Sequence, residues 1–244
     1  MGKFISNFET TAELEAFSAT TDFGRPHVSL TKDDSKIHFF EDPYKGHQYV
    51  EIGGLKWATM NVGANSITDY GLYFQWGDTQ GYTASQVGSG EGQKYFGWSD
   101  YKYSDNGTTA MTKYNSTDGK TVLDLDDDAA QGAWGGSWKM PTFEEFETLS
   151  AETTNVWVYN YNGSGVNGRL FKSKSDETKT LFFPAGGNCR DGKMTYNGSL
   201  GDYWFSSLLS NNNNWARCFM FRYENSYVSY GDRFGGLAVR AVVG

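Results

Sequence analysis

Cysteine, histidine and proline are scarce in this chain of 244 residues, which contains two, three and four of them respectively. Cys189 and Cys218 are too few for a disulfide scaffold and too far apart for a CxxC metal motif, and the sequence leaves open whether they pair. His27, His38 and His47 have no spacing that would bring them onto one ion. We therefore expect no metal site and no cofactor.

The sequence also lacks a long apolar run and a cluster of basic residues. No segment has the apolar length of a membrane helix, and the first residues, MGKFISNFETTAELEAF, interrupt their apolar side chains with polar ones, unlike a signal peptide. With 29 acidic and 21 basic side chains the net charge is -8, which opposes binding to phosphate backbones. We expect neither membrane insertion nor a nucleic-acid partner.

Aromatic residues and glycines are abundant. Aromatic side chains make up 17% of the residues and glycine occupies 30 positions, which suits short strands and tight turns better than a helical bundle. The length fits one large domain with a small appendage. We expect residues 1–43 to form a small attachment module, with a helix over 10–17 and a hairpin of 27–30 with 37–40, and residues 44–244 to form the main domain.

Turn and capping residues locate the first elements of the main domain. Gly53-Gly54 predicts the turn of a hairpin between residues 50–52 and 55–58. Thr142, followed by acidic residues, predicts the start of a helix over 143–149. The fold class expected from this mixture of strands and helices is α+β.

Three further stretches of the main domain carry weaker signals. The polar, tyrosine-rich stretch 77–120 is too long for a structureless loop, so we expect an ordered insertion. Residues 123–131 begin with acids and continue with alanines, which favours a second helix start over a calcium site because the spacing is not that of an EF-hand. Strands are expected at 180–184, 218–223, 227–230 and 237–243.

Four sequence blocks resemble one family. They are Leu55-Lys56-Trp57-Ala58-Thr59-Met60-Asn61-Val62-Gly63-Ala64, Gly132-Ala133-Trp134-Gly135-Gly136-Ser137-Trp138-Lys139-Met140-Pro141-Thr142, Tyr203-Trp204-Phe205-Ser206-Ser207 and Val239-Arg240-Ala241-Val242. Together they look like the C-type-lectin-like domains of Bacteroides-type surface proteins and of variable proteins of diversity-generating retroelements. The resemblance implies a C-type-lectin-like fold with two helices and long ordered insertions. The chain departs from the family at Ala241, where Pro is common, and at Phe205, where Ser is common.

The resemblance also implies where a binding site would lie. In retroelement-diversified members the variable positions fall in the last stretch of the domain, in a template rich in Asn codons, and residues 210–215 and 227–234 resemble such a template. Outward-facing strand and loop residues can be exchanged without disturbing the buried set. The predicted ligand-binding face comprises Phe205, Cys218, Met220, Arg222, Tyr223, Tyr227, Ser229, Tyr230, Asp232, Phe234 and Leu237.

A face of this kind implies a binding protein rather than an enzyme. Its partner would be a protein or glycan on a cell surface, and the chain itself would be displayed on a virion or a cell surface. A homo-oligomer would strengthen weak binding through avidity.

Three other functions compete with this interpretation. Formylglycine-generating enzymes have a similar fold and act through two cysteines, for which Cys189 and Cys218 are the candidates. A calcium-dependent lectin would need an E-P-N or Q-P-D triplet and a W-N-D partner, and the nearest match, Asn214-Trp215-Ala216, lacks the carboxylate. An invariant fimbrial or structural surface domain would be excluded by a near-copy of the coding sequence with adenine-specific differences.

Overall fold

The computed structural model describes residues 27–30, 37–40, 44 and 46–244, and the chain divides into two compact units, Met1–Tyr49 and Val50–Gly244. In the first unit β1 (His27–Leu30) pairs antiparallel with β2 (Ile37–Phe40), which confirms the predicted hairpin. The helix expected over 10–17 lies outside the described residues. The role of this unit in attachment stays a prediction.

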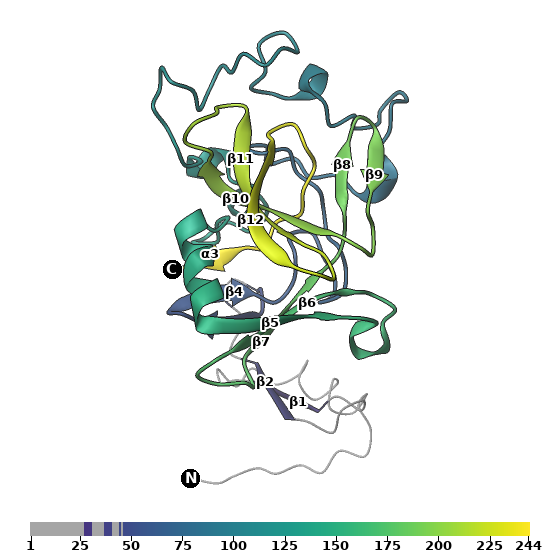
Figure 1. Ribbon diagram of the computed structural model, residues 1–244, viewed down its shortest axis with the longest axis vertical. Helices are drawn as coiled ribbons and strands as arrows, with labels where there is room; N and C mark the ends of the chain where they lie inside the picture. Colours follow the sequence, from purple (N-terminus) through teal and green to yellow (C-terminus); the bar gives the residue numbers. More distant parts are fainter. Residues whose placement is uncertain (1–26, 31–36, 41–43, 45) are drawn as a thin grey trace. The chain divides into compact units, whose positions relative to one another are not determined.

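The second unit mixes helices with small sheets (Figure 1), so the α+β class is confirmed. One sheet has the order β13-β4-β3, from Val242–Val243, Leu55–Ala58 and Tyr49–Ile52. A second consists of β5 (Thr153–Val158), β6 (Gly168–Ser173) and β7 (Thr180–Pro184). A third consists of β10 (Gly201–Leu208), β11 (Trp215–Phe221) and β12 (Ser226–Asp232), and β8 (Asn188–Arg190) pairs with β9 (Lys193–Thr195).

The helices of this unit are short. The α-helices are α2 (Ala129–Trp134) and α3 (Phe143–Glu152). Single 3-10 turns are η1 (Ala84–Gln86), η2 (Trp98–Asp100), η3 (Leu125–Asp127) and η4 (Tyr161–Gly163).

The predicted strands are present with shifted bounds. β7 coincides with the expected 180–184, whereas β11 starts and ends earlier than 218–223, and β12 extends the expected 227–230 at both ends. Of the expected strand 237–243, only Val242–Val243 is a regular strand, because Leu237 and Ala238 form isolated bridges with Phe74 and Tyr203 instead.

The turn between β3 and β4 depends on two glycines. Gly53 and Gly54 have φ of 62° and 76°, a conformation that side chains disfavour and that a two-residue type I′ hairpin turn requires. The predicted hairpin is therefore confirmed. β4 also pairs with β13, with Trp57 opposite Val242, so the last strand of the chain lies beside one of the first strands of the unit.

Helix α3 is fixed by its first turn. Thr142 Oγ1 accepts a hydrogen bond from Glu145 N at 3.2 Å, and Glu145 Oε2 accepts one from Thr142 N at 2.8 Å. This reciprocal capping box confirms the predicted helix start. The helix buries Phe146, whose ring lies 4.4 Å from that of Phe219 and 4.9 Å from that of Phe205. The main core thus joins α3 to β10 and β11.

The acidic segment 123–131 forms a helix start, as favoured, but the helix begins later than expected. Asp128 is the N-cap of α2, and its Oδ1 accepts from Ala130 N at 2.9 Å and from Gln131 N at 3.0 Å. Its Oδ2 accepts from Met140 N at 2.8 Å. Both oxygens of this carboxylate are thus used by the backbone.

The four blocks that carry the family resemblance meet inside the second unit. Arg240 of the last block donates to Asn61 of the first, with Nη2 2.7 Å from Oδ1. Asn61 Nδ2 donates in turn to Tyr203 Oη at 3.2 Å. Ser206, in the same block as Tyr203, donates its N–H to Pro141 O at 2.8 Å. Residues that are far apart in sequence therefore form one continuous scaffold.

Candidate binding site

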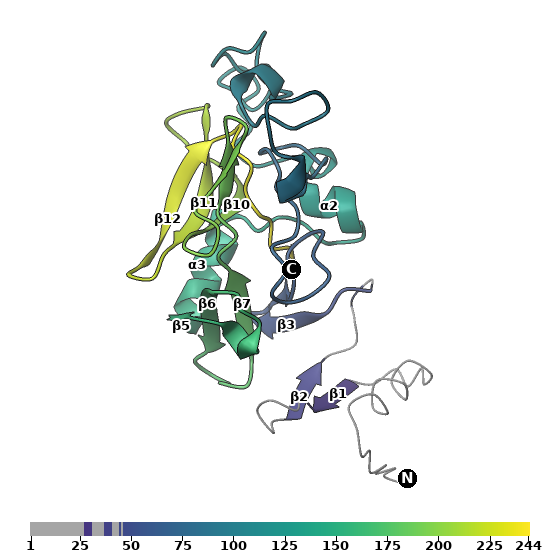
Figure 2. The same ribbon diagram turned by 90° about the vertical axis from the view of Figure 1, so that its right-hand side faces the viewer.

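Burial falls steadily across the sheet β10-β11-β12. Every residue of β10 is buried, β11 mixes buried and half-buried residues, and β12 has no buried residue. Figure 2 shows β12 on the outer side of the sheet, with no other part of the second unit beyond it. Within one sheet, the inner strand belongs to the core and the outer strand is presented to solvent.

The exposed tyrosines of β12 lie on opposite sides of the sheet. Side chains alternate along a strand, so Tyr227 and Ser229 face one side while Tyr230 and Asp232 face the other. The ring of Tyr230 stacks on that of Trp215, with centroids 4.8 Å apart and an interplanar angle of 22°. The expectation that these residues share one face is therefore corrected: they flank an edge strand from both sides.

Met220 and Arg222 lie on the side of Tyr227. Tyr227 Oη lies 3.2 Å from Met220 Sδ, directly across the β11–β12 ladder. The half-buried Arg222 guanidinium lies 4.8 Å from the ring centroid of Tyr196, which is 54% exposed. Aromatic and guanidinium groups of this kind are enriched where proteins anchor partners.

The hairpin between β11 and β12 adds a third tyrosine. Tyr223 is 59% exposed, and its ring centroid lies 5.8 Å from that of Tyr159, which follows β5 and is 60% exposed. Tyr159 and Tyr196 were not predicted, because they follow β5 and β9 in the sequence and only the fold brings them close to Tyr223 and Arg222. We call the predicted residues that remain accessible the β12 surface; they are Met220, Arg222, Tyr223, Tyr227, Ser229, Tyr230 and Asp232.

Four predicted site residues do not belong to this surface. Phe205 and Cys218 are 1% exposed, Leu237 is 2% exposed and Phe234 is 7% exposed. Phe205 contributes to the main core, and the main chain of Leu237 bridges to Phe74. The prediction that these residues face a ligand is therefore not met.

The burial of Cys218 has a specific cause. The side of the sheet that carries Cys218 also carries Trp204 and Asp202 of β10. Trp204 Nε1 donates to Phe74 O at 2.8 Å, and Asn188 of β8 donates to Asp202 Oδ2 at 3.0 Å. Other segments thus cover this side over β10 and β11, and solvent reaches it only near β12.

A buried carboxyl lies in this covered region. Asp202 is 4% exposed, and its Oδ1 has no hydrogen-bond partner of ordinary geometry among the residues that the structure describes. Burial raises the pKa of Asp202 to about 6, and hydrogen bonding from Asn188 and from the Cys218 thiol opposes that rise only in part. Asp202 was not among the residues singled out from the sequence.

The two thiols are deeply placed. Neither Cys189 nor Cys218 forms a disulfide. Burial raises the pKa of Cys189 to about 12, and burial together with the charge of Asp202 raises the pKa of Cys218 as well. Because the thiolate is the reactive form, both side chains have little nucleophilic character at neutral pH.

Asp232 at the end of β12 is held by two partners. Its Oδ1 accepts from Trp215 Nε1 at 2.8 Å, and its Oδ2 lies 3.0 Å from Arg190 Nη1. The Arg190 guanidinium also lies 5.2 Å from the ring centroid of Phe234. The side chain of Asp232 is therefore held in place by a hydrogen bond and an ion pair.

Arg233 fixes the point where the chain leaves β12. The side chain is fully buried, and Nε donates to Tyr101 Oη at 2.7 Å. Its Nη1 donates to Asn213 O at 2.9 Å, and its Nη2 donates to Lys113 O at 3.0 Å. One side chain thus ties the end of β12 to the Asn-rich loop 210–214 and to the insertion 77–120.

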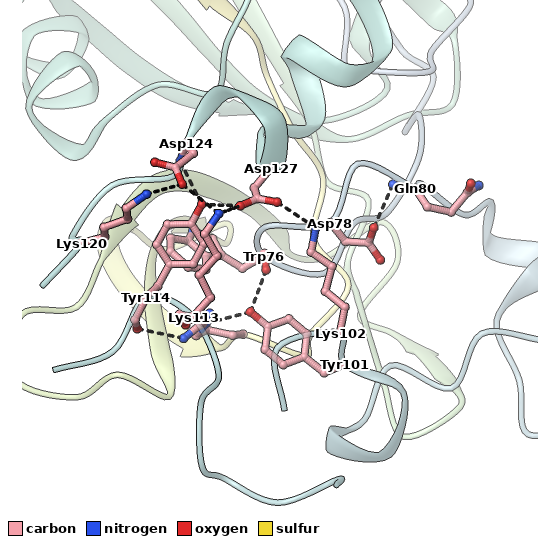
Figure 3. Close-up of polar contacts among 11 residues, drawn as sticks. Trp76, Asp78, Gln80, Tyr101, Lys102, Lys113, Tyr114, Lys120, Asp124 and Asp127 are labelled. Atoms are coloured by element: carbon pink, nitrogen blue, oxygen red, sulfur yellow. Dashed lines mark hydrogen bonds and ion pairs between the residues drawn. The ribbon is translucent and has the colours of Figure 1, made fainter. Parts of the chain in front are cut away.

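The insertion 77–120 is ordered around a cluster of charged and tyrosine side chains, which is drawn in Figure 3. Asp127 Oδ2 accepts from Tyr114 Oη and from Lys113 Nζ, both at 2.5 Å, and Oδ1 accepts from Lys102 Nζ at 3.1 Å. Burial disfavours the charged carboxylate, but these hydrogen bonds outweigh it and hold the pKa of Asp127 well below its usual range. The predicted ordered insertion is confirmed.

The described part of the chain has neither a metal-binding cluster nor a membrane-spanning helix. Those residues contain no group of three His, Cys, Asp or Glu side chains that could hold a metal ion. None of the helices among them is long and apolar enough to span a bilayer.

Comparison of the chain with protein-family models, with curated proteins and with solved structures finds no match. The fold class therefore rests on the elements described above.

Proposed function

We propose that this chain is a ligand-binding protein with a C-type-lectin-like fold that presents the β12 surface to a protein or glycan on a cell surface. The observation that carries the proposal is the fall in burial from β10 to β12. β12 has no buried residue and lies one strand away from β10, in which every residue is buried, so residues available for recognition are separate from those that stabilise the fold. Its exposed tyrosines are side chains that give large contact area at low entropic cost.

The contacts among the four sequence blocks support the lectin-like part of the proposal. A single block of this length could occur in many different folds, so contacts between the blocks are the stronger support. Here Asn61 receives hydrogen bonds from Arg240 and donates to Tyr203, so three of the blocks share one polar junction.

We extend the proposal to diversification of the retroelement type, with display on a virion or a cell surface. Exchange at Tyr223, Tyr227 or Tyr230 would change the ligand surface without opening the core, because each ring is at least 45% exposed. A homologous template near the gene, differing by adenine-specific changes at these codons, is the expected finding. A template whose differences fall on β10 codons would contradict the proposal.

A binding role also fits the two cysteines better than oxidative catalysis does. Cys189 packs with Tyr73 and Phe96, and Cys218 lies beneath the sheet against Asp202. Their raised pKa values disfavour thiolate formation, which the formylglycine-type alternative would require.

The direct test is a binding screen against gut-bacterial surface extracts. A variant with Tyr223→Ala, Tyr227→Ala and Tyr230→Ala is expected to bind about tenfold more weakly than the parent, with an unchanged Tm. The matched control is Tyr95→Ala, a 37% exposed tyrosine of the insertion, which should leave binding intact. If the triple variant binds normally and the control does not, the ligand site lies on the insertion.

A further inference from the structure

Among the described residues, no strand pairs with the outer edge of β12. In the sheet order β10-β11-β12 the only neighbour of β12 is β11. Apart from the ladder with β11, the main chain of Ser226–Asp232 forms one further hydrogen bond among the described residues, from Gly235 N to Asp232 O at 2.8 Å. A row of main-chain donors and acceptors therefore faces solvent.

The hairpin geometry indicates which residues carry those groups. Arg222 N donates to Asn225 O at 2.9 Å, which closes the hairpin, and the ladder then alternates along β12. This alternation turns the main-chain N–H and C=O of Val228 and Tyr230 away from β11. Both residues are thus able to pair with an added strand.

The edge also lacks the features that normally prevent strand addition. Edge strands are commonly protected by lysine, proline or a β-bulge. The sequence of β12, Ser-Tyr-Val-Ser-Tyr-Gly-Asp, contains neither lysine nor proline, and its register with β11 runs without a shift. By contrast, the register between β10 and β11 does shift.

We propose that the ligand contributes an extended, acidic polypeptide segment that pairs with Val228 and Tyr230 as a fourth strand of this sheet. The inference rests on the proposed function and names its ligand class. Main-chain pairing would supply affinity that does not depend on side-chain identity, while Tyr227 and Tyr230 would contact alternate side chains of the added strand on its two sides. Such a site would tolerate exchange of its side chains without losing its basic mode of binding.

Two arginines indicate that the added segment is acidic. Arg217 stacks on Phe143 on the Tyr230 side of the sheet, at 4.3 Å from the ring centroid, and Arg222 stacks on Tyr196 on the Tyr227 side. Neither guanidinium is among the ion pairs of the described residues. These arginines, carried by β11 and by the residue that follows it, lie one on each side of the sheet next to β12 and favour carboxylates on the incoming strand.

A second copy of the chain is a poorer occupant. In an antiparallel pair of β12 strands the only acidic residue offered by the strand would be Asp232, which Arg190 already binds. Self-pairing would leave Arg217 and Arg222 without carboxylate partners.

The test uses two synthetic strand-length peptides, one alternating Val with Glu and one alternating Val with Lys, and measures their binding by fluorescence anisotropy. The full chain is expected to bind the Glu peptide about tenfold more tightly than the Lys peptide. Val228→Pro removes the outward N–H without touching the ladder to β11, and is expected to weaken binding about tenfold. Val228→Thr, which keeps the N–H, is the matched control and should bind normally.

If Val228→Pro fails to fold, a Glu peptide N-methylated at alternate residues provides a second test, because N-methylation removes main-chain hydrogen-bond donors from the added strand. Loss of binding on N-methylation supports strand pairing; unchanged binding overturns it, as does a failure of the unmodified Glu peptide to bind. Sedimentation that finds a dimer for the full chain and a monomer for Val228→Pro would assign the edge to a second copy instead. If the tyrosine variants lose binding to surface extracts but Val228→Pro does not, the proposed function stands and the strand-addition inference fails.

Discussion

Arg240 donates two hydrogen bonds to the side-chain oxygen of Asn61, from Nε at 3.0 Å and from Nη2 at 2.7 Å, across 179 residues of sequence. The same guanidinium donates to Ala58 O at 3.1 Å and to Phe182 O at 2.9 Å. It is fully buried, and burial lowers its pKa to about 10. The charge therefore persists at neutral pH and is stabilised by amide dipoles, which joins the last sequence block to the first.

Replacing Arg240 should be among the most damaging single changes. Arg240→Met would leave three oxygen acceptors buried without donors, and we expect it to lower the free energy of unfolding by about 3 kcal/mol or more. Urea unfolding measures the loss. Arg217→Met, which removes a half-buried arginine from the same unit, should cost about 1 kcal/mol or less. Similar losses in the two variants would contradict the structural role of Arg240.

The raised pKa of Asp202 predicts that the protein loses stability as pH rises. Its folded pKa of about 6 exceeds the ordinary value of 3.8, so the folded state binds the proton more tightly than the unfolded state does. The contribution of this group is fully present below pH 3.8 and is lost as pH rises through about 6. Asp202→Asn should remove the effect and raise the free energy of unfolding by about 3 kcal/mol at pH 7 and above. Urea unfolding of both proteins between pH 5 and pH 8 would refute the prediction if the difference between them did not grow with pH.

Asp127 predicts the opposite dependence. Its folded pKa lies well below the ordinary value, so its contribution is present above pH 3.8 and is lost as pH falls below that value. Asp127→Asn should destabilise the protein at neutral pH, by about 2 kcal/mol, and should flatten its acid unfolding curve. The neighbouring, exposed Asp126→Asn serves as the control and should change neither property.

Mutations of exposed residues in and beside β12 should affect stability much less than mutations of core residues in the same sheet. Tyr223→Ala and Tyr227→Ala should each change the free energy of unfolding by about 0.5 kcal/mol or less, since both rings are largely exposed. Phe219→Ala, at a position 2% exposed in the main core, should cost about 3 to 5 kcal/mol. Thermal unfolding of the three variants checks the contrast, and equal losses would mean that the outer strand is also structural.

The parts of the fold that the sequence predicts are those governed by local rules. The start of α3 follows from the side chains of Thr142 and Glu145, each of which accepts a hydrogen bond from the backbone of the other, so two residues determine the outcome. The turn at Gly53-Gly54 is equally local, because it depends on the φ of two residues. Each of these predictions was confirmed.

The candidate site was predicted only in part because burial of a strand is decided by distant segments. Alternation separates Phe219 from Cys218 correctly, but it does not reveal that Cys218 is buried as completely as Phe219. Phe205 was assigned to the surface because it departs from a family habit, yet its ring packs against Phe146. Composition likewise gives no sign that Arg233 is buried, since arginine is normally exposed.

The fall in burial from β10 to β12 has a consequence for how the gene can change. Along the coding stretch for this sheet, the β10 codons specify buried side chains whose replacement would destabilise the protein, whereas the β12 codons include those of exposed side chains such as Tyr227, whose replacement would cost little stability. A mutational process that acts on the β12 codons would yield mostly folded variants with different surfaces. The same process acting on the β10 codons would yield mostly variants that do not fold. How readily this protein can acquire a new surface therefore depends on where along the chain its mutations occur.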